Sequence, residues 1–255
     1  MNILFTICGR AGSKGVRNKN FKDFLGYPLV YYTVSAIDLY LKKTPSVKGY
    51  IALNTDSEEL ISLFQENIKL DIDIVRRHSS LGLDDTPKID VIFSTLTAMT
   101  KRKNTDYEMV VDLDITSPLR TVKDVSNLVN KKIASDVDVI YSITDSRRNP
   151  YFNMVKKSDH GYERVIASSF NTRQEAPEVF DMNASLYAYS PQFLENGKGL
   201  FDGESDIIKM KDTAVLDLDH IGDFELMQVI AEYLFGKGQQ FKEIRENIHS
   251  FLQNY

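Results

Sequence analysis

A short apolar run at the start of the chain, followed at once by a glycine-rich basic loop, constrains the fold more than any other feature. Residues 3–8 have the length and character of a strand buried in a parallel sheet. The glycines and cations that follow are Gly9, Arg10, Gly12, Lys14, Gly15, Arg17 and Lys19. Glycine lets the backbone turn tightly and expose N–H groups, and fixed cations beside those groups suit a polyphosphate. The sequence therefore predicts a phosphate site at the carboxyl end of the first strand.

This loop matches neither of the two most familiar nucleotide fingerprints. The spacing from Gly9 to Lys14 does not fit Gly-x-x-x-x-Gly-Lys, and it does not fit Gly-x-Gly-x-x-Gly either. The alternative is an ordinary turn between strand and helix, with solvated lysines. Four cations within residues 10–19 favour phosphate binding over that alternative.

Strand and helix patterns alternate over the next part of the chain. The predicted strands are residues 47–53, 72–75, 109–113 and 137–143, and the predicted helices begin near residues 28, 58, 87 and 121. This alternation predicts an α/β fold with a parallel, doubly wound sheet, whose ligands lie at the carboxyl ends of the strands.

The pattern changes between residues 147 and 189. Extended segments at 151–155, 162–167 and 185–189 follow one another without helices, so we expect a β-rich excursion that is a candidate oligomer contact. Residues 214–218 are expected to return to the sheet, before closing helices near 223–235 and 241–252. The whole chain, 1–255, is interpreted as a single domain.

Composition limits the partners and the compartment. A formal net charge of −5 over 255 residues, with no basic face evident, argues against nucleic acid as a partner. Cys8 is the only cysteine, so an intrachain disulfide is excluded and a reducing compartment is indicated. No apolar run approaches 18 residues, and no signal-peptide pattern opens the chain. We expect a soluble cytoplasmic protein with no membrane partner.

Residues 9–15, together with Asn18, Lys19 and Asn20, resemble the nucleotide loop of the acylneuraminate cytidylyltransferases. That family comprises the CMP-sialic acid synthetases and their relatives for legionaminic and pseudaminic acids. Its loop usually begins Ala-Arg-Gly-Gly, whereas this chain has Cys-Gly-Arg-Ala-Gly at residues 8–12. The nucleotide-binding residues that this resemblance implies are Arg10, Ala11, Gly12, Ser13, Lys14, Lys19 and Asn20.

A second stretch, residues 76–86, resembles the family's Arg-Pro-x-x-Leu-x-x-Asp-Thr segment if one residue is inserted. Arg77 then takes the place of the arginine that lies by the cytidine and its phosphates, and His78 replaces the proline. The alternative for Arg77 is a solvated basic side chain.

A third stretch, residues 112–120, carries Thr-Ser-Pro-Leu-Arg, which is characteristic of the family at a strand end. Thr116 and Ser117 are thereby implied in nucleotide binding, although their hydroxyls could instead form a turn and cap the next helix. Asp114 stands where the family commonly has a glutamine near the sugar. We therefore expect Asp114 to contact the sugar and to influence which sugar is accepted, with metal binding as the alternative.

A fourth stretch, residues 171–187, resembles Arg-x-x-x-x-Pro followed by Asn-Gly-x-Ile-Tyr, with Ala184 in place of the glycine. The resemblance implies that Arg173 reaches the sugar carboxylate, often from the partner subunit, and that Asn183 and Ser185 bind substrate. A guanidinium favours bidentate pairing with a carboxylate. A solvated loop arginine is the alternative for Arg173.

Asp217 and Asp219 match the family's Asp-x-Asp metal motif. Carboxylates at i and i+2 on a strand project to one face, and oxygen ligands beside phosphates suit Mg²⁺, or Mn²⁺ in its place. The alternative is strand termination and helix capping.

The motifs follow the family's order over nearly the whole chain. The resemblance implies a Rossmann-like, glycosyltransferase-A-like nucleotidyltransferase fold with a mostly parallel sheet, and a homodimer with residues 147–189 as a dimerisation and substrate sub-lobe. It also implies transfer of CMP from CTP to the anomeric hydroxyl of a 2-keto-3-deoxy sugar acid, releasing pyrophosphate. Arg10, Lys14 and Asp217 would be catalytic.

Alternative functions stay open from the sequence. The acceptor could be an octulosonic acid or a sugar phosphate rather than a nonulosonic acid, or the chain could be a nucleotide-binding module without turnover. Intact Lys14, Asp217 and Asp219 weigh against a module without turnover.

Overall fold

One seven-stranded sheet organises the chain. The computed structural model describes residues 1–12, 16, 18–83, 85–212, 218 and 220–253. Its strands are β1 (Asn2–Gly9), β4 (Lys48–Thr55), β5 (Ile72–Arg76), β6 (Met109–Leu113), β7 (Val139–Asp145), β10 (Phe180–Tyr189) and β11 (Ser205–Lys209). Their order across the sheet is β11-β7-β10-β6-β1-β4-β5. Only β10 among these strands runs antiparallel to its neighbours, so the predicted mostly parallel sheet is confirmed.

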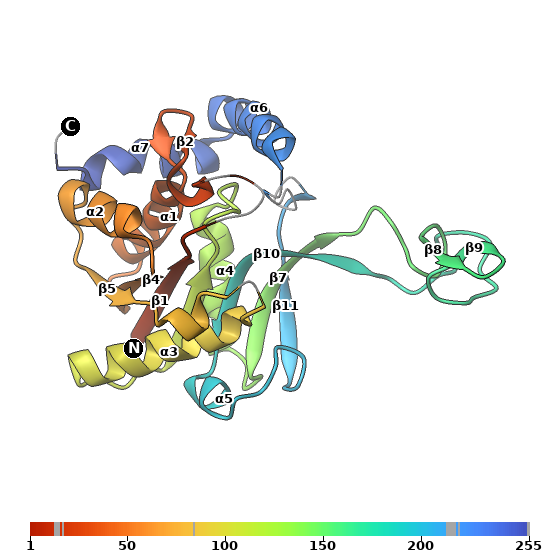
Figure 1. Cartoon of the computed structure of the whole chain (residues 1–255), viewed down its shortest axis with the longest axis horizontal. Helices are drawn as coiled ribbons and strands as arrows, with labels where there is room; N and C mark the ends of the chain where they lie inside the picture. The colour runs from red at the N-terminus through yellow and green to blue at the C-terminus, as the bar shows by residue number, and fades with distance from the viewer. Residues whose placement is uncertain (13–15, 17, 84, 213–217, 219, 254–255) are drawn as a thin grey trace.

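Helices cover both faces of the sheet and create two hydrophobic cores (Figure 1). α1 (Val30–Lys43), α4 (Val122–Ile133) and α7 (Gln239–Phe251) pack together over the larger core, and α3 (Lys88–Lys103) and α5 (Pro191–Glu195) cover the smaller one. In β1, Ile3 and Phe5 belong to the larger core and Leu4 to the smaller one. Because both faces of β1 are buried, its sequence is continuously apolar instead of alternating. The other described helices are α2 (Glu58–Asn67), α6 (Ile221–Lys237) and the 3-10 turns η1 (Lys19–Phe21) and η2 (Ser79–Leu81).

Local sequence signals place most helix starts. Thr121 caps α4 as predicted, because its hydroxyl accepts from the N–H of Asp124 while the Asp124 carboxylate accepts from the N–H of Thr121. The start predicted near residue 28 was early. Pro28 belongs instead to a two-residue strand, β3 (Tyr27–Pro28), which pairs with β2 (Asp23–Phe24) before α1 begins at Val30.

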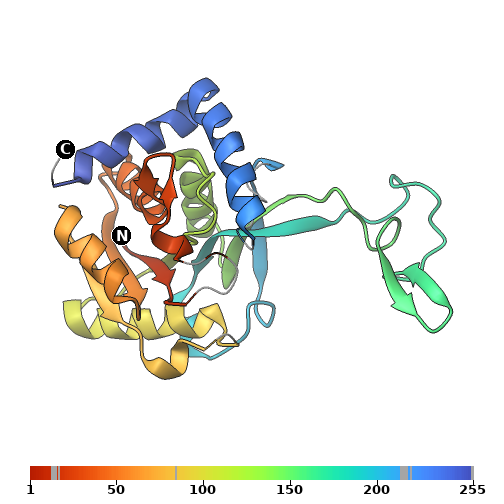
Figure 2. The same ribbon diagram turned by 45° about the horizontal axis from the view of Figure 1, so that its top comes forward.

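An arm projects from the ends of β7 and β10, as Figures 1 and 2 show. Its tip is a hairpin of β8 (Val155–Ser158) and β9 (Gly161–Arg164). The extended segment predicted at 151–155 was wrong over most of its length, because residues 151–153 form turns before β8 begins. Residues 180–189 form β10 within the central sheet, so the projecting part of the predicted excursion ends near residue 179.

The sheet closes with a strand that the sequence pattern did not reveal. β11 lies parallel to β7 at the edge of the sheet. Of the strand predicted at 214–218, only Leu218 falls among the described residues, and it is fully buried in the larger core. In the described part of the chain, no helix combines the length and apolar character needed to cross a membrane.

Candidate functional site

The predicted site lies where the order in which the chain adds strands to the sheet reverses its direction. From β1 the chain moves outward through β4 to β5, and then returns to place β6 on the other side of β1. The carboxyl ends of β1 and β6 therefore flank a topological switch point, the usual ligand crevice of an open α/β sheet. The glycine-rich loop follows β1 and the Thr-Ser-Pro-Leu-Arg stretch follows β6, so the fold brings these two predicted motifs to one edge.

Two hydrogen bonds hold the nucleotide loop in place at the residues that the structure describes. The Asn20 amide donates to the Arg10 carbonyl at 3.2 Å, and the Ala11 N–H donates to the Asp56 carboxylate at 2.7 Å. One small cavity of about 70 Å³ is lined by Arg10, Ala11, Gly12, Lys19 and Asn20, among other residues, and their binding of the nucleotide stays a prediction. Ser13 and Lys14 lie outside the described residues. Asp56, which lies just before the helix predicted to begin near residue 58, thus anchors the loop.

Gly9 and Gly12 are required for different reasons. A Cβ on Gly9 would lie 2.8 Å from Cδ2 of Leu60 and 2.9 Å from Cδ1 of Ile115, so the strand end has no room for a side chain. Gly12 has open space around it, but its φ of +73° is a conformation that other residues rarely adopt.

Arg77 lies at the ends of β4 and β5, and its contact with the nucleotide stays a prediction. Its Nε donates to the Asn54 side-chain oxygen at 2.8 Å, and a terminal nitrogen donates to the Asn54 carbonyl at 3.1 Å. Asn54 is fully buried and is held in turn by the Thr95 hydroxyl at 2.9 Å. Burial lowers the pKa of the Arg77 guanidinium, and the nearby carboxylates of Asp56 and Asp112 partly oppose that effect.

Lys88 is a functional candidate that the sequence analysis missed. It is the first residue of α3, and its ammonium lies 2.7 Å from a carboxylate oxygen of Asp112 and 2.7 Å from one of Asp114. Asp112 is fully buried within β6, and its other oxygen accepts from the Thr6 hydroxyl at 2.7 Å. Burial opposes the charge on Lys88, but the two carboxylates outweigh it and raise the pKa of the ammonium well above its ordinary value. We call Lys88, Asp112 and Asp114 the lysine–aspartate cluster.

Asp114 makes further contacts within the protein. Its second carboxylate oxygen accepts from the N–H and from the hydroxyl of Thr116, both at 2.8 Å. Burial alone would raise the pKa of Asp114, but Lys88 and the Thr116 bonds hold it well below its ordinary range. Thr116 therefore helps to form the turn, which was the structural alternative considered for its hydroxyl.

The arginine of the Thr-Ser-Pro-Leu-Arg stretch is internal. Arg120 is fully buried, and it donates to the carbonyls of Asp114 and Ser117, the latter at 2.9 Å from Nε. Burial lowers the pKa of Arg120 to about 10. Its role is to clamp the turn after β6. The buried Ser117 hydroxyl has no hydrogen-bond partner within the described part of the chain, and so stays a candidate for ligand contact.

Asn183 and Ser185 lie beside this turn, on β10. The Asn183 side-chain oxygen accepts from the Ser142 hydroxyl at 2.5 Å and from the Ser185 N–H at 3.3 Å, so it supports the sheet. The Ser185 carbonyl accepts from the Asp114 N–H at 3.1 Å, and the buried Ser185 hydroxyl is unpaired among the described residues. Ala184, which replaces the family's glycine, has φ +50° where the strand register shifts. That conformation explains why the related motif has glycine there.

Arg173 is placed elsewhere, at the base of the arm. It is exposed, and it donates to the Ser146 carbonyl beside a cavity of about 280 Å³. This cavity is lined by Asp145, Ser146, Asn149, Arg173, Gln174, Ala176, Pro177, Glu178 and Val179. The structure thus brings Asp114 and Ser185 into contact, whereas Arg173 occupies a separate cavity.

The predicted metal ligands, Asp217 and Asp219, lie outside the described residues. Leu218 between them is described, and its carbonyl accepts from the Lys19 ammonium at 3.1 Å. Among the residues that are described, no group of three or more His, Cys, Asp or Glu side chains is arranged to hold a metal ion.

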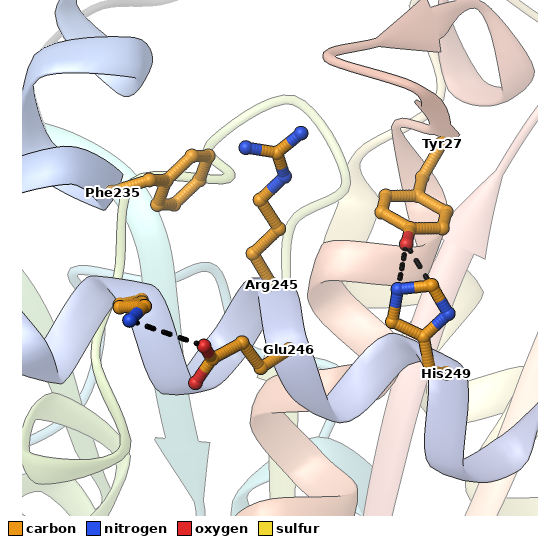
Figure 3. Close-up of a pocket in the computed structure, with 6 residues that line it drawn as sticks. Tyr27, Phe235, Arg245, Glu246 and His249 are labelled. Atoms are coloured by element: carbon orange, nitrogen blue, oxygen red, sulfur yellow. Dashed lines mark hydrogen bonds and ion pairs between the residues drawn. The ribbon is translucent and has the colours of Figure 1, made fainter.

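Another cavity, of about 230 Å³, lies between β3 and the helices α6 and α7 (Figure 3). There the Tyr27 hydroxyl lies 2.5 Å from Nε2 of His249, and Lys242 pairs with Glu246 at 3.4 Å. Arg245 donates to the Leu25 carbonyl at 3.2 Å. These contacts attach α7 to the β2–β3 hairpin and do not involve the carboxyl edge of the sheet.

Known proteins resemble this chain in sequence and in fold. Residues 4–254 match the family described as Cytidylyltransferase. The chain is 30% identical to the CMP-N,N'-diacetyllegionaminic acid synthase of Campylobacter jejuni, covering 89% of this chain and 94% of that protein. It is 25% identical to the N-acylneuraminate cytidylyltransferase of Streptococcus agalactiae, covering 95% of this chain and 56% of that protein. A solved CMP:2-keto-3-deoxy-manno-octonic acid synthetase complexed with CTP has a TM-score of 0.64 at 13% identity, with 91% and 99% of the two chains covered.

Proposed function

Since the chain belongs to the cytidylyltransferase family, we propose that it transfers CMP from CTP to the anomeric hydroxyl of a 2-keto-3-deoxy sugar acid, releasing pyrophosphate. The acceptor we propose is a nonulosonic acid, the class named for the Campylobacter and Streptococcus relatives. One observation carries the proposal. The loop residues Arg10, Lys19 and Asn20 line one cavity after β1, and the turn after β6 follows the neighbouring parallel strand at the same edge of the sheet.

The nucleotide half of the site would bind the negatively charged triphosphate of CTP. In-line attack at the α-phosphorus needs positioning and charge neutralisation more than covalent catalysis. Arg10, Lys14 and Lys19 would neutralise the triphosphate, and main-chain N–H groups near Gly12 would orient it. The Ala11 N–H donates to the Asp56 carboxylate, so it would have to break that hydrogen bond before it could bind a phosphate.

Mg²⁺, or Mn²⁺, is part of the proposal, with Asp217 and Asp219 as its ligands. Two carboxylates suit a hard divalent cation, and Lys19 of the nucleotide loop contacts the carbonyl of Leu218, the residue between them in the sequence. When bound, the cation would supply charge stabilisation at the phosphates. Asp217→Asn should remove most activity while the thermal midpoint is kept, and unchanged rates at limiting Mg²⁺ would count against this assignment.

The acceptor half lies toward β10 and the arm. Ser117 and Ser185 have buried hydroxyls available for a polar ligand, and Arg173 would bind the sugar carboxylate within a homodimer. Exposed apolar side chains on the arm, including Val155 and Tyr162, support self-association. Asp114, whose oxygens accept from Lys88 and Thr116, would support the acceptor site, and its contact with the sugar stays a prediction.

The experiment is a pyrophosphate-release screen. CTP, UTP, ATP and GTP are each tested with N,N'-diacetyllegionaminic acid, N-acetylneuraminic acid, 2-keto-3-deoxy-manno-octonic acid and a sugar 1-phosphate. We expect release only with CTP and a sugar acid, fastest with a nonulosonic acid. Release with the sugar phosphate, or with another nucleotide in preference to CTP, would overturn the proposal.

A further inference from the structure

The lysine–aspartate cluster contains a buried charge arrangement that the proposed roles above do not use. Lys88 comes from the start of α3, whereas Asp112 and Asp114 come from β6 and the turn after it. Only about a third of the Lys88 side chain and a fifth of the Asp114 side chain are exposed, 34% and 22%, and Asp112 is completely covered. Buried charges are costly, so an arrangement of three requires an explanation.

The hydrogen bonds and ion pairs within the lysine–aspartate cluster show which of its three side chains can bind a ligand. Asp114 accepts from Lys88 through one oxygen and from Thr116 through the other. Asp112 is covered and is engaged by Lys88 and Thr6. An ammonium has three N–H donors, and the carboxylates of Asp112 and Asp114 occupy two of the directions around Lys88. Within the described part of the chain the third has no protein oxygen as its acceptor, so it can donate to a ligand.

The cluster also lies between the two halves of the site. Asp112 pairs with Thr6 of β1 in the sheet register on one side, and with Tyr187 of β10 on the other. The Lys88 ammonium lies 5.8 Å from the centre of the Tyr187 ring. The nucleotide loop follows β1, and the acceptor candidate Ser185 lies on β10. The ammonium therefore lies between the nucleotide and acceptor sides, where the α-phosphate of CTP must meet the attacking hydroxyl.

We propose that Lys88 is a catalytic residue that donates a hydrogen bond from its remaining N–H to a non-bridging oxygen of the CTP α-phosphate, and that Asp112 and Asp114 are positioning residues. This inference rests on the proposed function. The bond between the α-phosphorus and the oxygen bridging to the β-phosphate breaks as the bond to the anomeric oxygen forms. Pyrophosphate leaves with the bond electrons, the proton of the anomeric hydroxyl passes to solvent, and Lys88 keeps its proton throughout.

The same geometry assigns the two carboxylates to a lysine instead of a metal ion. An ammonium already bridges Asp112 and Asp114 at 2.7 Å from each, so a divalent cation there would have to displace it. The cluster carries a net charge of −1, against −2 without Lys88. Lys88 thus also reduces the repulsion that an incoming triphosphate would meet at this point.

The test uses α-thio analogues of CTP, in which sulfur replaces one non-bridging oxygen or the other. Sulfur accepts hydrogen bonds poorly, so the diastereomer with sulfur facing Lys88 should be turned over more slowly. The principal variant is Lys88→Met with Asp112→Asn, which keeps the cluster at −1 and leaves no fully buried carboxylate unpaired. Lys88→Arg preserves both ion pairs but redirects the remaining donor. Lys101→Met, at an exposed lysine near the other end of α3, is the matched control.

We expect the double variant to lose about 100-fold in kcat, as when a transition-state donor is removed. Its discrimination between the diastereomers should shrink by about tenfold, while the KM for the sugar acid stays the same. Lys88→Arg should keep the wild-type thermal midpoint and still lose kcat, and this outcome decides the matter if the double variant does not fold. Lys101→Met should behave as wild type.

Three outcomes would overturn the inference without touching the proposed function. The first is an active wild type with undiminished kcat in the Lys88 variants. The second is a fall in kcat with unchanged discrimination between the diastereomers, and the third is a change confined to a higher KM for the acceptor. A wild-type enzyme with no CTP turnover would instead contradict the proposed function itself.

Discussion

The ammonium of Lys19 donates a 3.1 Å hydrogen bond to the carbonyl of Leu218, a residue 199 positions later in the chain. Leu218 is fully buried in the larger core, and Lys19 belongs to the turn η1 that ends the nucleotide loop. The bond therefore ties the loop after the first strand to the segment that contains the Asp-x-Asp motif. These are the two parts of the chain to which we assign the triphosphate and the metal.

Replacing Lys19 should damage nucleotide binding more than folding. In Lys19→Met, kcat/KM for CTP should fall by about 100-fold, because the lost ammonium neutralises phosphate charge. Stability should fall by at most about 1.5 kcal/mol, the scale of one hydrogen bond. Titration calorimetry with CTP and a thermal midpoint measure the two effects, with Lys69→Met as an exposed control. Unchanged CTP affinity in Lys19→Met would refute the assignment.

Ala184→Gly should stabilise the protein. A non-glycine residue at φ +50° costs about 1–2 kcal/mol, and glycine returns part of that gain through its greater freedom in the unfolded chain. We expect a net gain of about 0.5–1 kcal/mol in the free energy of unfolding, measured by denaturant titration. Ala188→Gly, in a regular and fully buried part of the same strand, should destabilise instead. Equal losses in both variants would mean that Ala184 is not strained.

Acid should remove the stability that Asp114 contributes. Its pKa is held below the ordinary value of about 3.9, so the unfolded state binds more protons than the folded state as the pH falls through that region. The contribution is complete above about pH 4 and disappears below it. The difference in unfolding free energy between wild type and Asp114→Asn should therefore shrink as the pH falls from 6 toward 2. A constant difference over that range would contradict the ion pair with Lys88.

The arm should hold two copies of the chain together. Val155 and Tyr162 are 62% and 77% exposed near its tip, where apolar side chains have no folding role to explain them. Wild type should scatter light as a dimer at micromolar concentration, and Val155→Ser with Tyr162→Ser should shift it toward a monomer. Ile133→Ser, at an equally exposed apolar residue on α4, should stay dimeric. A monomeric wild type would end the proposal.

The sequence predicted the features that depend on local pattern. The buried first strand, the cap at Thr121 and the start of α3 after Pro87 follow from neighbouring residues alone. β11 was missed because its sequence, Ser-Asp-Ile-Ile-Lys, is short and half polar, as a sheet-edge strand allows. Pro28 was read as a helix start because proline is common there, but pairing with Asp23 placed it in a hairpin.

The sequence predicted only those site residues that belong to local sequence patterns. Arg10, Lys19, Asn20 and Arg77 were identified because they match linear motifs. Lys88 could not be identified, since its partners lie 24 and 26 residues away and only the fold unites them. The signal available was weak: Asp112, a charge at the centre of an apolar strand, needs a buried partner. The ion pair between Asp114 and Lys88 could not be predicted either, because the two residues lie 26 positions apart in the sequence.

The central claim is that the anomeric oxygen of a sugar acid attacks the α-phosphorus of CTP. A direct measurement uses a nonulosonic acid labelled with ¹⁸O at its anomeric hydroxyl, with mass spectrometry of both products after a short reaction. We predict that the label appears in the CMP-sugar, in the oxygen that bridges carbon and phosphorus, and that pyrophosphate carries none. Formation of CMP without a sugar adduct, or an adduct that has lost the label to pyrophosphate, would contradict the account.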